Sequence, residues 1–118
     1  MRVSQKQFEV FKESFCKWQK ILNMLDWKVY FVMKDTKSDC FAQARYDTVS
    51  RVAKVLLNDT VFGDNINFLD PARHGKHEAM HLFLASLTGY ADERFVSKEE
   101  INKENERLVV LLVKLIKE

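Results

Sequence analysis

Three histidines, His74, His77 and His81, lie within eight consecutive positions of this chain, and the sequence holds no other histidine. On a helix, residues four apart lie about 40° from each other on one face, so His77 and His81 can present both imidazoles to one metal ion. Glu78 projects about 100° away from His77, where it can reach a metal-bound water without being a ligand. The HExxH spacing therefore predicts two metal ligands and a general base.

The residues around the motif predict the helix that must carry it. Asp70 is a good N-cap, Pro71 suits the first helical position, and Gly89 is placed to end the helix in a left-handed conformation. After the motif the segment is apolar on nearly every side, so we expect a central, buried helix over residues 70–87. Burying polar groups without partners is costly, which indicates that the histidines and Glu78 have a function.

A catalytic zinc ion usually has three protein ligands and one water. The metzincin pattern would require glycine and histidine where this chain has Leu84 and Leu87, so that class is excluded. No histidine or cysteine follows His81, and a third ligand further along the chain must therefore be a carboxylate. The expected source is a last helix over residues 98–117, capped by Ser97 with Glu100 at its third position.

Helical geometry ranks the glutamates of this last helix. With Leu108 at the centre of the apolar stripe, Glu104 lies about 40° from that centre, Glu100 about 80° and Glu106 about 160°. Glu104 is therefore the predicted third ligand, and Glu106 should face solvent. Three alternatives remain open: Glu100, Asp92 in the preceding loop, and His74 one turn before His77.

The rest of the chain predicts an α+β fold in one domain, residues 1–118. Apolar residues recur at steps of three and four from Ser4 to Leu25, which predicts an amphipathic helix. Strands are expected over residues 27–33, 41–46 and 51–58, the last two as a hairpin. Residues 61–69 should form an irregular connection with one helical turn or a short edge strand. The expected architecture is an N-terminal helix on a small, mostly antiparallel sheet of about three strands, then the motif helix and a C-terminal helix.

Composition excludes several other classes of protein. The chain is 47% apolar with a formal net charge of only +2, which favours a folded domain and gives no reason to expect a nucleic-acid partner. No run of about 18 apolar residues occurs, and the first ten residues lack the apolar core of a signal peptide, so we expect no membrane association and a cytoplasmic location. Cys16 and Cys40 are not in metal-ligand spacing and should be buried thiols.

The motif His77-Glu78-x-x-His81 with a downstream glutamate resembles the gluzincin branch of the zincin metallopeptidases. In layout the chain is similar to small HExxH proteins of phage and bacterial genomes, distantly related to SprT-like domains. This resemblance implies a zincin-like fold, zinc held by His77 and His81, and Glu78 as base. It also implies a sheet edge beside the motif helix that pairs with an extended peptide, for which Arg51 to Asn58 is the expected strand. The downstream histidine or cysteine ligand of SprT-like domains is missing here.

The resulting functional hypothesis is a zinc-dependent metallopeptidase in which metal-activated water attacks a peptide carbonyl with Glu78 as general base. Tyr46, Tyr90 and Arg94 are candidates for stabilising the oxyanion, although packing or solvated roles are the more common ones for such residues. The alternative hypothesis is a non-catalytic zincin-like metal-binding module that docks on a protein partner.

Overall fold

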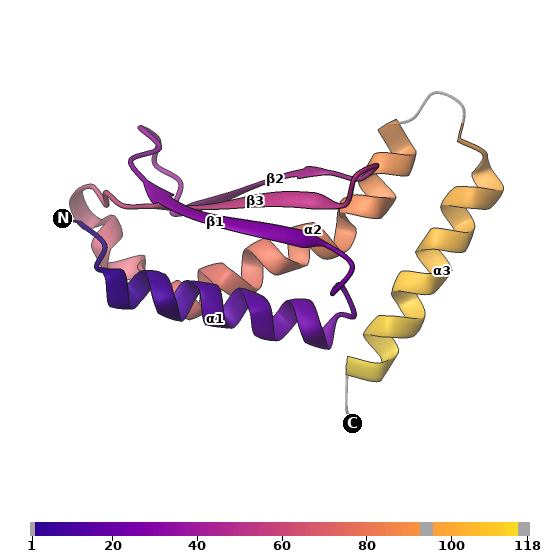
Figure 1. Cartoon of the computed structure of the whole chain (residues 1–118), viewed down its shortest axis with the longest axis horizontal. Helices are drawn as coiled ribbons and strands as arrows, with labels where there is room; N and C mark the ends of the chain where they lie inside the picture. The colour runs from indigo at the N-terminus through magenta and orange to yellow at the C-terminus, as the bar shows by residue number, and fades with distance from the viewer. Residues whose placement is uncertain (1, 93–95, 116–118) are drawn as a thin grey trace.

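The computed structural model describes residues 2–92 and 96–115, and their architecture confirms the α+β prediction (Figure 1). The elements in chain order are α1 (Gln5–Ile21), β1 (Lys28–Lys34), β2 (Ala42–Asp47), β3 (Val52–Asn58), the 3-10 helix η1 (Gly63–Phe68), α2 (Pro71–Asp92) and α3 (Lys98–Leu115). Of the two alternatives predicted for residues 61–69, a helical turn or a short edge strand, the structure forms the helical turn, η1. Among the described residues, no helix is long and apolar enough to cross a membrane.

The three strands are arranged in the order β1-β3-β2, with β1 parallel and β2 antiparallel to β3. The sheet is therefore mixed, not mostly antiparallel, although the predicted hairpin of β2 and β3 is confirmed. The prediction that Arg51 to Asn58 forms the sheet edge is wrong, because β3 is paired on both sides. Val55, Leu56 and Leu57 are each at most 1% exposed, so side chains on both faces of this strand are buried, as is typical of a central strand.

Helix α1 packs on one face of the sheet through its aromatic stripe. Phe11 and Phe15 are fully buried and meet Phe31 of β1 edge to face, with ring centroids 6.5 Å and 5.3 Å apart. The helix ends at Ile21, four residues before the predicted end, because Asn23 adopts a left-handed conformation with φ of 58°. Asparagine tolerates this conformation, which ends the helix and turns the chain towards β1.

The start of α2 is as predicted. The Asp70 side chain accepts a hydrogen bond of 3.2 Å from the backbone N–H of Arg73. The predicted end at Gly89 is wrong, because α2 continues to Asp92. Gly89 stays helical and allows a close approach to the turn after β2, since a Cβ atom there would lie 3.0 Å from the side chain of Thr48. This glycine therefore serves packing and not termination.

Helix α3 lies beside the rest of the molecule and packs on α2, as Figure 1 shows. The Ser97 hydroxyl accepts a hydrogen bond of 3.1 Å from the backbone N–H of Glu100, which confirms Ser97 as the cap. Leu108 is 3% exposed and is the centre of the inward face, as predicted. The radius of gyration of 15.7 Å exceeds the roughly 13.5 Å expected for a compact domain of this length, because α3 extends the molecule at one end.

Asn58, at the end of β3, holds the loop that leads from β1 to β2. Its amide N–H₂ group donates to the carbonyls of Ser38 and Cys40 at 3.0 Å and 2.9 Å. Its side-chain oxygen accepts from the backbone N–H groups of Thr36 and Thr60 at 3.3 Å and 3.2 Å. A side chain that is 2% exposed thus satisfies four backbone groups.

We expect Asn58→Leu to lower the free energy of unfolding by about 3 kcal/mol, because leucine has a similar volume but leaves these backbone groups without partners. Urea denaturation measures the change. The control Asn67→Leu, at an exposed position of η1, should shift the free energy of unfolding by no more than about 0.5 kcal/mol. Similar losses in both variants would contradict the role given to Asn58.

Candidate metal site

His77 and His81 are exposed on one face of α2, and their Nε2 atoms lie 3.1 Å apart. The two rings are nearly perpendicular, with centroids 4.7 Å apart. Two imidazole nitrogens bound to one tetrahedral zinc at about 2.0–2.1 Å are separated by roughly 3.3 Å. The predicted pair of ligands is therefore brought together at a separation suited to binding one ion.

Glu78 lies next to the pair and is 6% exposed, yet it forms no hydrogen bond or ion pair with any described residue. Burial raises the pKa of its carboxyl above the usual value, and the nearby His81 and His77 partly oppose that shift. A buried carboxyl without a partner is costly to keep in a structural role. Its position beside the two histidines and its raised pKa are consistent with a proton acceptor.

Glu78 and His77 face a cavity of about 340 Å³ between the first turns of α2 and the beginning of β2. Its other lining residues are Cys40, Phe41, Ala42, Arg73 and His74. The sheet edge beside the motif is thus β2, which the sequence had not indicated.

Cys40 is exposed at this wall, and Cys16 is exposed on α1, so the prediction that both are buried thiols is wrong.

His74 lies in the same cavity wall and stacks on Phe41, with centroids 4.4 Å apart and an interplanar angle of 18°. Burial lowers the pKa of its imidazole, although a hydrogen bond with the backbone of Phe68 opposes the shift. Its Nε2 atom is buried without a hydrogen-bond partner among the described residues. A neutral imidazole held by its other nitrogen is the form that binds metals, but among the described residues His74 does not form a group with His77 and His81 that could hold a metal ion.

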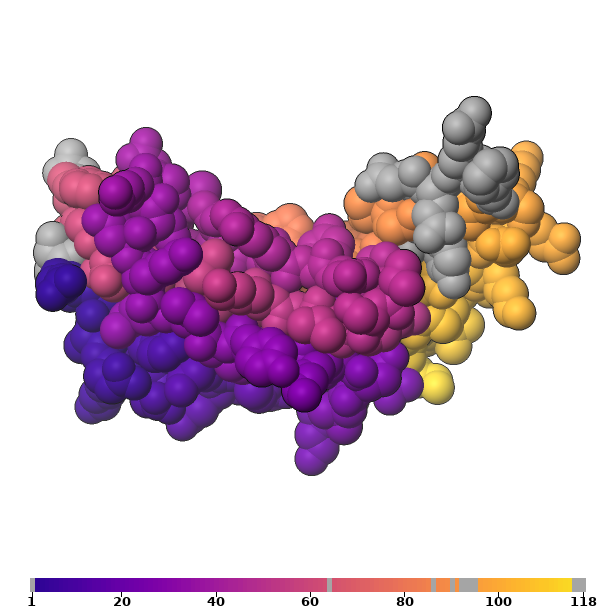
Figure 2. All heavy atoms as spheres, turned by 45° about the horizontal axis from the view of Figure 1, so that its top comes forward, coloured from indigo at the N-terminus to yellow at the C-terminus, as the bar shows by residue number. Residues whose placement is uncertain are grey.

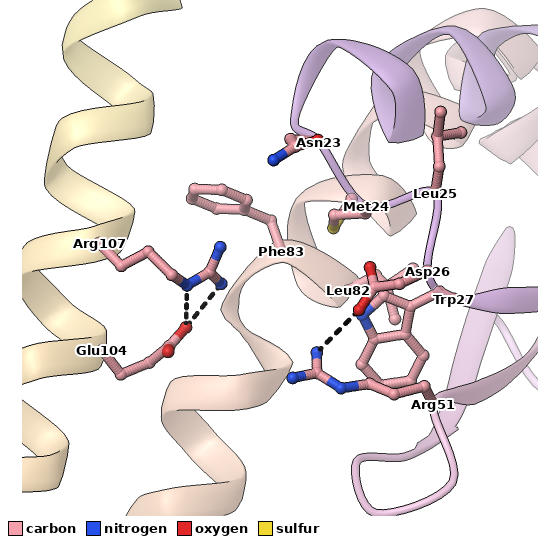
Figure 3. Close-up of a pocket in the computed structure, with 10 residues that line it drawn as sticks. All are labelled: Asn23, Met24, Leu25, Asp26, Trp27, Arg51, Leu82, Phe83, Glu104 and Arg107. Atoms are coloured by element: carbon pink, nitrogen blue, oxygen red, sulfur yellow. Dashed lines mark hydrogen bonds and ion pairs between the residues drawn. The ribbon is translucent and has the colours of Figure 1, made fainter.

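The predicted third ligand, Glu104, is not brought to His77 and His81. Its side chain is buried to 12% exposure, as the helical phase predicted, but it receives two hydrogen bonds from Arg107, at 2.9 Å and 2.6 Å. Figure 3 shows the two side chains at a separate cavity of about 440 Å³, which Leu82, Phe83 and Arg51 also line.

The reason for this error is the face of α2 that α3 covers. Leu82 and Phe83 lie about 100° and 200° around α2 from His81, so a side chain that reaches them from α3 is directed away from the two histidines. The face of α3 that packs on the rest of the molecule was predicted correctly. A side chain on that face does not, however, point towards the histidines.

Two further predicted candidates, Glu100 and Tyr46, are not brought to the motif either. Among the described side chains, no three histidine, cysteine, aspartate or glutamate residues form a group that could hold a metal ion. Glu100 is exposed at the start of α3, and Tyr46 meets Trp27 edge to face at 6.4 Å. The side chains of Asp92 and Tyr90, and Arg94 as a whole, lie outside the described residues.

We expect Glu104→Ala to leave zinc affinity within about twofold of the wild type, because its carboxylate is paired with Arg107 away from the histidines. Titration with a chromophoric zinc competitor measures the affinity. The matched control is Glu106→Ala, an exposed glutamate two positions along the same helix. A selective loss of affinity in Glu104→Ala would restore Glu104 as a ligand.

Comparisons of the chain with protein families, with curated proteins and with solved structures gave no match. The geometry of His77, Glu78 and His81, with the cavity beside them, is therefore the basis for assigning a function.

Proposed function

We propose that the chain is a zinc-dependent peptidase of zincin-like architecture. The observation that carries the proposal is the pair of Nε2 atoms of His77 and His81, 3.1 Å apart, next to a buried Glu78 that has no partner among the described residues. Helical spacing alone brings two histidines four residues apart close together, so the buried carboxyl of Glu78 at the cavity is the part of this arrangement that favours a function.

The residues present fit a zinc ion in part. His77 and His81 would supply two nitrogen ligands, whereas His74, in the same cavity wall, does not complete a group of three with them. Zinc bound there would lower the pKa of a coordinated water to about 7 and polarise a carbonyl group. Glu78 would accept the proton of the attacking water and then hold it for transfer to the leaving amine.

The expected substrate is an extended segment of a peptide or protein. Among the described elements, β2 (Ala42–Asp47) is paired with β3 alone, so the other edge of β2 retains backbone donors and acceptors. This strand begins at the wall of the cavity that Glu78 faces. A peptide added to β2 as a fourth strand would run past His77 and Glu78.

One observation favours a second candidate, a zincin-like module that binds metal and a protein partner without hydrolysis. The described side chains provide no complete set of three ligands, and a site with an incomplete set of protein ligands would hold zinc more weakly.

The deciding experiment measures zinc in the purified protein by mass spectrometry, and cleavage of an unfolded protein substrate with and without a chelator. We expect stoichiometric zinc after reconstitution and cleavage that stops when the metal is removed and returns when zinc is added. Zinc binding without cleavage would favour the binding module. Failure to take up zinc would overturn both candidates.

A further inference from the structure

Six consecutive residues in the second half of α3, residues 108–113, are apolar around the whole circumference of the helix. Residues 108–113 form the run LVVLLV, of which Leu108 alone is buried. The outward side chains remain 39–66% exposed: Val109, Val110, Leu112 and Val113. A helix that is hydrophobic on all sides is normally covered on all sides, and valine is a poor residue for an exposed helical position. This face therefore requires a partner.

The exposed side chains of Val109, Val110, Leu112 and Val113 form an apolar ridge, and a groove lies directly beside it. Its volume is about 440 Å³, and its lining is Asn23, Lys103, Glu106, Arg107, Val110 and Leu111. The ridge and the groove share α3, which lies at one end of the molecule in both views (Figures 1 and 2). A ridge and a groove on one surface are self-complementary, because a two-fold axis can place each ridge against the groove of the other copy.

We propose that this face binds a second copy of the chain, through antiparallel pairing of the two α3 helices about Val110. Glu106 and Lys114 lie four residues before and four residues after Val110. Antiparallel pairing about that residue places Glu106 opposite Lys114 of the second copy, twice per dimer. Parallel pairing would place identical charges side by side and would also align the two helix dipoles unfavourably.

The size of this face predicts a reversible dimer. An 18-residue helix is about 27 Å long, so one helical face buries an area at the lower end of specific interfaces. Interfaces of this size usually give dissociation constants in the micromolar range, and the oligomeric state should then depend on concentration.

Sedimentation velocity from low micromolar to several hundred micromolar protein tests the proposal. We expect a monomer–dimer equilibrium for the wild type, and a dissociation constant at least about tenfold higher for Val110→Glu, because the two-fold axis would place the two introduced carboxylates opposite one another in the interface. The matched control is Val49→Glu in the turn between β2 and β3, where the valine is 84% exposed. A monomeric wild type, or equal effects of both variants, would overturn the proposal.

Charge reversal tests the antiparallel arrangement. Glu106→Lys and Lys114→Glu should each weaken self-association, since each places like charges opposite one another. Mixed in equal amounts, the two variants should form a heterodimer with wild-type affinity, because every facing pair is then of opposite charge. Absence of recovery on mixing would exclude antiparallel pairing about Val110. None of these residues lines the cavity at His77, so the outcome is independent of zinc binding and hydrolysis.

Discussion

Glu78→Gln should reduce the turnover number at least about 100-fold while zinc affinity stays within about twofold of the wild type. Glutamine has nearly the same shape as glutamate but cannot accept a proton, and general base catalysis contributes roughly 10²–10⁴-fold to a rate. The ligands His77 and His81 are unchanged, so metal content should not fall. Cleavage of the unfolded substrate, with zinc measured on the same sample, provides both readouts.

The matched control for this variant is Glu13→Gln on the exposed surface of α1, which should match the wild type in both readouts. Loss of activity in Glu78→Gln together with loss of zinc would mean that Glu78 positions the metal. Unchanged activity would exclude Glu78 as the base.

The same substitution should raise the stability of the metal-free protein at neutral pH. Burial raises the pKa of Glu78 in the folded state above its usual value, so folded wild type carries a costly buried charge once the pH exceeds that raised pKa. The free energy of unfolding of the wild type therefore falls as the pH rises from the ordinary glutamate pKa through the raised one. Glutamine does not titrate, and its advantage should disappear at pH values below the ordinary pKa.

Urea denaturation of chelator-treated protein, at neutral pH and below the ordinary glutamate pKa, measures this difference. An advantage of Glu78→Gln that is the same at both pH values would show that its cause is not the ionisation of Glu78.

Gly75→Ala should destabilise the fold by about 2–4 kcal/mol. Alanine normally stabilises a helix interior by about 1 kcal/mol relative to glycine. Here a Cβ atom would lie 2.5 Å from the backbone oxygen of Phe11 and 3.0 Å from the Cβ atom of Ser14. Helices α1 and α2 would have to move apart, which would disturb the core that Phe11 and Phe15 form with the sheet.

Gly89→Ala is the matched control, since it is the same change within the same helix. Its Cβ atom would meet only side-chain atoms of Thr48, the nearest at 3.0 Å, and a small shift of the turn that carries Thr48 would relieve this contact. We expect a change within about 1 kcal/mol in urea denaturation. A small effect at Gly75 would show that α1 and α2 tolerate a wider separation.

Local patterns predicted the elements of this fold well, and they predicted the part of the site that is local in sequence. Ser4 and Asp70 cap their helices as expected, and the periodic apolar residues of α1 are the ones that reach the sheet. His77, Glu78 and His81 needed nothing beyond helical spacing to come together. Asn23 could have predicted the end of α1, because asparagine often adopts the left-handed conformation that ends a helix.

The errors concern relations between elements, which spacing along the chain does not determine. The apolar residues on both faces of β3 could have indicated a central strand. The parallel pairing of β3 with β1, however, depends on how the loop from β1 to β2 crosses the sheet. The helical phase of Glu104 was right, but its partner depended on which face of α2 receives α3. The cavity wall at Phe41 was missed for the same reason, since its contact with His74 joins two elements far apart in sequence.

The strand order β1-β3-β2 also has a consequence for how the chain acquires its structure. The strand made last takes the central place, so β1 and β2 have no pairing partner in the sheet until residues 52–58 have emerged from the ribosome. The whole sheet then forms in one step, together with the Asn58 hydrogen bonds that close the loop behind it. Ribosome-bound chains that expose fewer than the first 58 residues should therefore lack protease-resistant structure, and resistance should appear only once β3 is available.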